Sequence, residues 1–274
     1  VQGTAISGLT ATTDTLFAVE NDGVSGISIL SANDNHGYLL FGDGDDNNVG
    51  WIYYNHSSNF MRFRTSGSDA MTIDLSGNVG IGTTSPSSFH GSYDNLVVGT
   101  GIGDNGITIY GNSSNSSGLA FADGTSGDAT YRGTITYNHS VDKFYIGGSS
   151  NTQQLTIVGS SGNVGIGTTA PDQTLHVYRG SAGSVAGMGS AGIILEDDTS
   201  VFLNFLAPAS ADVGIMFGDV NDNDVGAIVY EHANNKMNFR TNTSTKMTID
   251  SSGNVGIGTS SPGSTDTTVQ GDSG

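Results

Sequence analysis

The sequence predicts an all-β protein that is built as an elongated array of three related units. Two observations lead to this prediction. The phrase Ser-Gly-Asn-Val-Gly-Ile-Gly-Thr occurs at 76–83, 161–168 and 252–259, so it returns after 85 and then 91 residues. An identical phrase at such intervals is the signature of a repeat architecture. Between the copies, apolar residues alternate with other residues, which is the period of a half-buried strand.

The first and third units define the order of the strands. They align without a gap over 46 residues, from 41–86 to 217–262, at a constant offset of 176. In both, Phe-Gly-Asp opens a loop rich in Asp and Asn. Runs of the type Ile-x-Tyr-x-His, Met-x-Phe-Arg-Thr and Met-Thr-Ile-Asp follow, and each predicts a strand. The second unit keeps this order with substitutions.

Two weaker apolar segments open each unit, and each is predicted to form a strand. The first of them lies at Leu16–Val19, Leu96–Val98 and Leu175–Val177, and the second at Ile27–Leu30, Ile107–Ile109 and Ile193–Leu195. We therefore place the units at 15–86, 87–171 and 172–262. Residues 1–14 and 263–274 are then connecting segments.

The repeated glycine phrase predicts a turn, a strand and a stop. Its Ser-Gly-Asn step is turn chemistry, because Gly and Asn tolerate positive φ. In the Val-Gly-Ile-Gly step, Val and Ile point to one face while glycine leaves the other bare, which is typical of a close backbone approach. Pro86, Pro171 and Pro262 then end the strand. The structural residues of the three copies are Gly77, Asn78, Gly80, Gly82, Gly162, Asn163, Gly165, Gly167, Gly253, Asn254, Gly256 and Gly258.

Composition excludes several classes of protein. The net charge is −18 with only eight Lys and Arg, so a nucleic-acid partner is excluded by repulsion from the phosphate backbone. No apolar run is long enough for a membrane span, which argues against membrane insertion. Cysteine is absent, which excludes disulfides and thiolate chemistry.

A single unit is expected to need partners. Its few large apolar side chains do not offset the entropy cost of ordering its backbone. Its strand edges also need cover against aggregation. A homo-oligomer meets both needs, and three chains about one axis is one such arrangement. The periodicity alone does not select three chains over two or four.

The repeated strings resemble a known family. Met-Thr-Ile-Asp-x-Ser-Gly-Asn-Val-Gly-Ile-Gly-Thr-x-Ser-Pro resembles a phrase common in bacteriophage tail-fibre and virion-appendage proteins, and also seen in large repetitive bacterial surface proteins. The likeness covers most of 39–86, 119–171 and 215–262. It implies a β-rich homotrimeric fibre at the virion surface or otherwise extracellular. Other virion or appendage proteins and a host cell-surface glycan are its implied partners. The family supplies no catalytic residues.

The resulting hypothesis is a structural segment of a trimeric extracellular fibre, without enzymatic activity, that projects a host-attachment region. Two alternatives stay open. One is an adhesin module that itself binds glycan or another receptor. The other is a glycan-cleaving tailspike, for which Glu196, Asp197 and Asp198 would supply paired carboxylates.

Three sets of residues are candidate sites. His56, His139 and His232 share one repeat position, which predicts a packed histidine at a strand end or, alternatively, a metal ligand on a symmetry axis. Trp51 and Tyr53 lie on the face opposite Ile52 and Tyr54, and are candidates for glycan binding or for packing against a neighbouring chain. No cofactor is expected except calcium. Oxygen ligands for it stand at alternate positions in two acidic loops, namely Asp43, Asp45, Asn47, Asp219, Asn221 and Asn223, although plain acidic turns explain the same spacing.

Overall fold

The computed structural model describes residues 24–148, 152–184, 186–263 and 267–269, and it confirms the all-β prediction. The chain divides into two compact units, 1–111 and 112–274. The first unit holds one sheet, and the second unit holds two among its described residues. In the described part, helical structure is limited to two short 3₁₀ turns, η1 (Pro86–Ser88) and η2 (Gly127–Tyr131).

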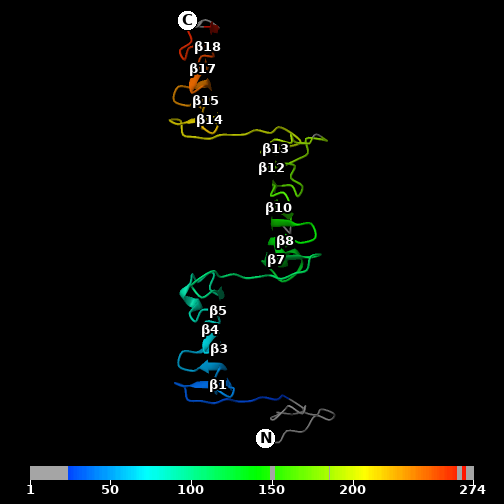
Figure 1. Cartoon of the computed structure of the whole chain (residues 1–274), viewed down its shortest axis with the longest axis vertical. Helices are drawn as coiled ribbons and strands as arrows, with labels where there is room; N and C mark the ends of the chain where they lie inside the picture. Colours follow the sequence, from blue (N-terminus) through cyan, green and yellow to red (C-terminus); the bar gives the residue numbers. More distant parts are fainter. Residues whose placement is uncertain (1–23, 149–151, 185, 264–266, 270–274) are drawn as a thin grey trace. The chain divides into compact units, whose positions relative to one another are not determined.

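The sheet of the first unit, sheet A, is a meander of six strands in chain order (Figure 1). Neighbours are antiparallel from the first strand to the fifth, and the sixth is parallel to the fifth. The strands are β1 (His36–Phe41), β2 (Gly50–Asn55), β3 (Phe60–Thr65), β4 (Ser68–Ile73), β5 (Val79–Ile81) and β6 (Leu96–Val98).

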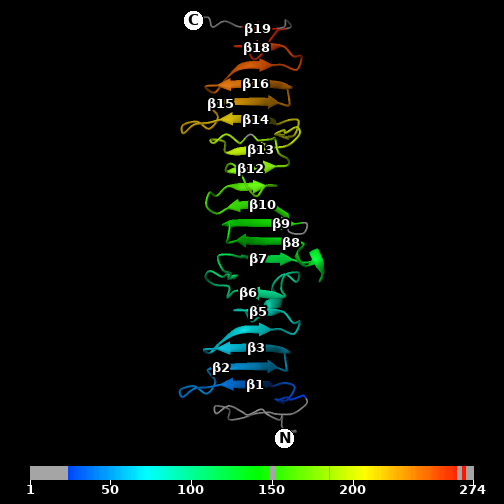
Figure 2. The ribbon, with the colours of Figure 1, turned by 90° about the vertical axis from the view of Figure 1, so that its right-hand side faces the viewer.

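The two sheets of the second unit repeat this plan, and each is a single layer of strands (Figure 2). Sheet B consists of β7 (Ser116–Phe121), β8 (Gly133–Asn138), β9 (Lys143–Gly148), β10 (Thr152–Val158), β11 (Val164–Ile166), β12 (Leu175–Tyr178) and β13 (Ile193–Glu196). Sheet C consists of β14 (Asp212–Phe217), β15 (Gly226–Glu231), β16 (Lys236–Thr241), β17 (Ser244–Ile249), β18 (Val255–Ile257) and β19 (Thr267–Val269).

Turn residues fix the register of the hairpins. The β3–β4 turn uses Ser66 and Gly67, and the equivalent turn of sheet C uses Asn242 and Thr243, all with positive φ. Two consecutive residues of this kind form the primed turn whose twist matches the flanking strands. At the β2–β3 turn, Tyr54 Oη donates to Asn59 Oδ1 at 3.0 Å. The same contact joins tyrosine and turn residue in sheets B and C.

The glycine phrase forms the predicted turn and strand, and its bare glycine has a specific neighbour. Gly77 has φ +85°, and Asp74 Oδ1 accepts from the amides of Ser76 and Asn78 at 2.9 Å each. A Cβ on Gly80 would lie 2.5 Å from the carbonyl oxygen of Thr83. The close approach therefore comes from the chain's own next turn.

The sheets continue past the predicted unit boundaries. After Pro86, the chain returns to pair β6 in parallel with β5, and β12 and β19 pair in the same way with β11 and β18. The boundaries at 86/87 and 171/172 therefore fall inside sheets, because the proline ends a strand but not the sheet. The described part of 263–274 likewise contains β19.

The predicted opening segments have different outcomes. Leu96–Val98 and Leu175–Val177 lie in strands, as does Ile193–Leu195, but each is the last or nearly last strand of the preceding sheet. The prediction of strands at Ile27–Leu30 and Ile107–Ile109 was wrong, because these segments have no hydrogen-bonded neighbour strand in the described chain. Leu16–Val19 lies outside the described residues.

Candidate functional site: the uncovered apolar faces

Each sheet has one face formed almost wholly by apolar side chains, which we call the apolar face. Strand pairing aligns opposite residues into rows that run across the whole sheet. In sheet A the main row is Leu39, Ile52, Phe63, Met71, Ile81 and Val98, and a second row continues through Tyr54, Met61, Ile73, Val79 and Leu96. Apolar residues that alternate in sequence thus become continuous ladders.

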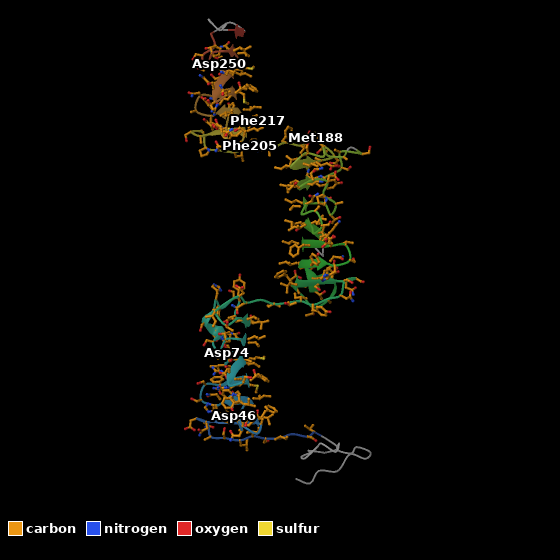
Figure 3. All side chains as sticks on the ribbon, in the orientation of Figure 1. Asp46, Asp74, Met188, Phe205, Phe217 and Asp250 are labelled. Atoms are coloured by element: carbon orange, nitrogen blue, oxygen red, sulfur yellow. The ribbon has the colours of Figure 1, made fainter. Side chains whose placement is uncertain are left out.

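Sheets B and C carry the same ladders. The main row of sheet B is Leu119, Ile135, Ile146, Leu155, Ile166, Val177 and Leu195. The main row of sheet C begins with Ile215, Ile228, Phe239, Met247 and Ile257. Figure 3 shows side chains extending to both sides of each single-layered sheet.

The apolar faces are uncovered in the single chain. Among the described residues, the buried hydrophobic side chains are only Tyr53, Ala227 and Val229. By contrast, Phe41, Phe121 and Phe217, which occupy one repeat position, are 52%, 57% and 54% exposed. A contiguous exposed apolar surface on a soluble protein typically marks an interaction site.

The opposite face, which we call the polar face, is covered near the glycine phrase by the chain itself. Gly80 pairs with Thr72, and the bare side of this pair meets Thr83 and Pro86. Pro86 is buried, and Thr72 is 1% exposed. The corresponding Thr156 and Thr248 of sheets B and C are also buried. The repeated phrase therefore places its loop on the polar face and leaves the apolar face bare.

The apolar face of sheet A is not flat. A hollow of about 430 Å³ lies among Ile29, Leu39, Ile52 and Met61. Ile29 comes from the extended segment before β1, and its Cγ2 would lie 3.3 Å from a Cβ on Gly37. This segment thus lies against the edge of the apolar face.

Each of the three histidines contacts the tyrosine two residues earlier. The ring centroids of Tyr54 and His56 are 5.0 Å apart in an edge arrangement, and the other two pairs repeat it. His232 Nδ1 donates to the carbonyl oxygen of Ala211 at 2.7 Å, while His139 Nε2 lies 3.3 Å from Ser117 Oγ. These contacts give each ring a structural role, and a metal on a symmetry axis stays a prediction.

The acidic loops use their carboxylates as turn caps. Asp43 Oδ1 accepts from the amides of Asp45 and Asp46, both at 2.9 Å, and these bonds lower the pKa of Asp43. Asp219 Oδ1 accepts in the same way from Asn221 and Asp222. The described residues hold no group of three or more His, Asp or Glu that could bind a metal. Calcium binding by the mixed Asp and Asn set stays a prediction.

Trp51 and Tyr53 lie on the polar face, but they belong to an aromatic cluster. The ring of Trp51 lies 5.5 Å from that of Tyr38, and the guanidinium of Arg64 lies 4.5 Å over the indole. Tyr53 is 8% exposed and accepts from Arg62 at 3.2 Å. Side chains of the same sheet thus contact both rings, and glycan binding and packing against a neighbouring chain both stay predictions at these two residues.

The carboxylates considered for a tailspike are engaged in local contacts. Glu196 lies 3.0 Å from His176 Nε2, and its other oxygen accepts from the amide of Ala182. Asp197 accepts from Thr199 at 3.1 Å and pairs with Arg179. These contacts hold β12 and β13 to the loops that follow them. No helix among the described residues has the length and apolar character to cross a membrane.

Comparison of the sequence with protein-family models found no match, and comparison with curated proteins found none either. The resemblance to tail-fibre proteins therefore stays a prediction that depends on the repeated strings.

Proposed function

We propose that this chain is a structural segment of a homotrimeric extracellular fibre, such as a phage tail fibre or a similar appendage, that projects a host-attachment region. The observation that carries the proposal is the uncovered apolar face, present on all three sheets in the same register. Copies of the chain complete the core by packing these faces together.

Self-association explains why the apolar face is the uncovered face of the single chain. A partner of different sequence would need three separate matching surfaces, whereas a second copy carries the same ladders in the same order. The number three comes from the family resemblance. The apolar faces themselves require only that copies meet.

The extended segments support the same proposal. Ile27, Leu30, Ile107, Phe202 and Leu206 are largely exposed, and they precede the first strands of the three sheets. Several exposed apolar side chains gathered on one segment form a patch of the kind that marks an interaction site. In an intertwined fibre, such segments lie against the sheets of other copies.

A matched pair of phenylalanine sites tests the proposal. Phe41, Phe121 and Phe217 lie on the apolar faces, whereas Phe89 follows η1 in the loop and is 56% exposed. Burying a whole Phe side chain gives about 1.5–3 kcal/mol, so the half that is exposed gives about 0.8–1.5 kcal/mol per ring. Replacing the three face rings by Ser thus weakens association by more than tenfold per chain.

The measurement is sedimentation velocity over a range of concentrations. We expect the triple variant to dissociate at concentrations where the native chain and Phe89→Ser remain assembled. The proposal would be refuted if the native chain were monomeric, or if the substitutions on the apolar face and in the loop weakened association equally.

A further inference from the structure

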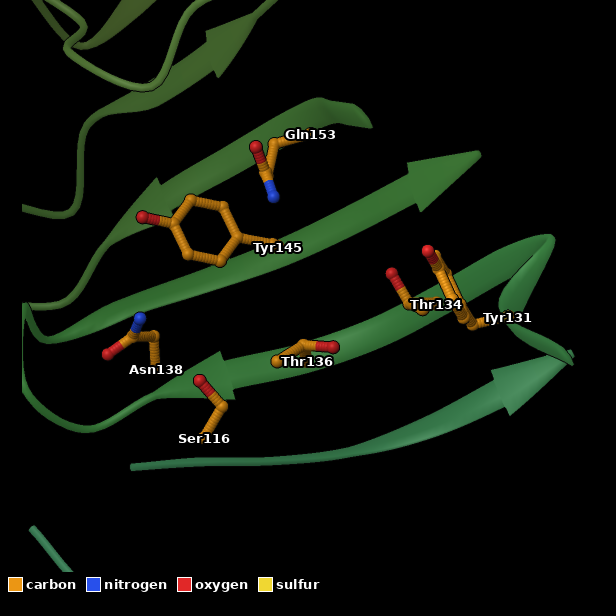
Figure 4. A pocket seen from close by; sticks show the side chains of 7 residues that line it. All are labelled: Ser116, Tyr131, Thr134, Thr136, Asn138, Tyr145 and Gln153. Carbon is orange, nitrogen blue, oxygen red and sulfur yellow. The ribbon is translucent and has the colours of Figure 1, made fainter. Parts of the chain in front are cut away.

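A pocket lies on the polar face of sheet B, opposite the apolar face. It has a volume of about 260 Å³ and is partly open to solvent. Figure 4 shows the side chains that line it. Ser116, Thr136, Asn138 and Tyr145 line it from β7, β8 and β9, and Tyr131 lines it from η2. These residues lie on the face opposite Leu119, Ile135 and Ile146.

The pocket exists because sheet B has small residues where sheet A has large ones. Gly118 and Thr136 pair with each other in sheet B, and sheet A has Tyr38 and Tyr53 at these repeat positions. The two rings in sheet A stack 5.5 Å apart and fill the space. In sheet B the space stays open.

A longer loop supplies one wall of the pocket. Phe121 and Gly133 are twelve positions apart, whereas Phe41 and Gly50, and likewise Phe217 and Gly226, are nine apart. The additional residues form η2, which brings Tyr131 to the pocket. The loop and the small residues therefore act together at this one sheet.

The lining is polar but carries no charge, although the chain has a net charge of −18. Within the described residues, the hydroxyl groups of Ser116, Thr136 and Tyr145 form no hydrogen bond to other protein groups. Asn138 Oδ1 accepts from the amide and hydroxyl of Ser140, which leaves its amide NH₂ as a donor. Donors and acceptors thus stand next to the tyrosine rings.

We propose that this pocket binds a neutral saccharide, as one or two sugar rings of a glycan. Sugar hydroxyl groups match the mixed donors and acceptors, and the apolar face of a pyranose ring packs on tyrosine. No lining cation is present to hold a phosphate, sulfate or carboxylate, and no lining carboxylate to hold an amine. The volume is slightly below that of pockets for drug-sized ligands, which suits a small sugar unit.

The inference depends on the proposed function only in that association must cover the apolar face and leave the polar face open. Each copy then presents one pocket, so that several weak sites act together on a glycan-coated surface.

The test uses saturation-transfer NMR on the whole chain with glucose, galactose and N-acetylglucosamine, and with glucuronic acid as the charged probe. We expect millimolar binding of at least one neutral sugar and none of glucuronic acid. Thr136→Tyr, which restores the residue of sheet A, is expected to weaken binding at least tenfold. Tyr145→Ala is a second variant, and Tyr93→Ala is the control, since Tyr93 is an exposed tyrosine in the loop of sheet A.

The expected dissociation constant is about 1 mM. If none of the neutral sugars binds at about 20 mM, twenty times that value, the inference is overturned. The inference would also be refuted if Thr136→Tyr had the same Tm as the native chain and bound the sugar equally well. A preference for glucuronic acid over the neutral sugars would refute it too. Sedimentation of the same samples separates this result from the proposed function, because a chain that assembles without binding sugar refutes only the saccharide site.

Discussion

Replacing Gly80 by alanine tests the account of the glycine phrase. A Cβ at this position would lie 2.5 Å from Thr83 O, 3.0 Å from Thr83 Cγ2 and 3.4 Å from Pro86 Cδ. The nearest atom is a backbone carbonyl oxygen, so a rotamer change cannot relieve the overlap. Gly165 has an equally close carbonyl neighbour, and for Gly256 the corresponding distance is 2.6 Å.

Two opposing terms set the magnitude. Overpacking costs about 1–3 kcal/mol, whereas the loss of unfolded-state freedom from Gly to Ala stabilises by about 0.4–1 kcal/mol. The net loss is at most about 2.6 kcal/mol, which lowers Tm by up to roughly 5 °C for a chain of this length, at about 2 °C per kcal/mol.

The assay is thermal unfolding followed by circular dichroism, for Gly80→Ala, Gly165→Ala and Gly256→Ala separately. Gly44→Ala is the control, because a Cβ at Gly44 would meet no heavy atom within 4 Å and the φ of Gly44 is not positive. The control is expected to change stability by less than about 0.5 kcal/mol. Equal Tm values for the control and the three phrase variants would refute the reasoning.

Four further outcomes are expected. Thr243→Gly raises the unfolding free energy by about 1 kcal/mol in chemical denaturation, because Thr243 has φ +59° where sheet A has Gly67; no gain would contradict the strain. Hydrogen bonds from Asn254 and neighbouring amides lower the pKa of Asp250 in the folded chain, so its stabilisation is complete above the unfolded pKa and is lost as pH falls below about 4. Asp250→Ala should therefore flatten the acid limb of a Tm-against-pH curve. Arg62→Ala leaves Asp69, its partner at 2.9 Å, half-buried without a cation and costs about 1–3 kcal/mol in the same denaturant assay. If the acidic loops bind calcium, Tm is higher in millimolar calcium than in chelator, and equal Tm values would refute the calcium prediction.

Much of the fold could be predicted from local patterns. Alternation at Ile52–Tyr54 and Met61–Phe63 places these residues on one face, and pairing with neighbouring strands then forms the ladders. The turn of the glycine phrase was predictable because glycine and asparagine are the residues that positive φ requires. Asp74 and Asp250 add the hydrogen bonds that hold this turn.

The parallel strands could not be placed from sequence. A three-residue apolar run such as Leu96–Val98 fits equally well as the last strand of one sheet or the first of the next. Only pairing with β5 across the intervening loop decides between them. Likewise, Ile107–Ile109 has the composition of a strand but no neighbour in the described part of its own chain, and composition does not reveal the absence of a neighbour.

The candidate sites show a similar division. Alternation correctly placed Trp51 on the face opposite Ile52, but the stacking of Arg64 on its ring depends on cross-strand register. The pocket of sheet B was missed, although the additional residues before Gly133 and the small Gly118 and Thr136 were visible in the aligned units. Each change alone is ordinary in sequence, and only the structure brings them to one place.

The mass of the native chain in solution is the most direct test of the central claim, that copies cover each other's apolar faces. Sedimentation equilibrium at micromolar concentration should give a mass of three times 28.0 kDa, about 84 kDa. A stable species of 28.0 kDa over the whole concentration range would contradict the account.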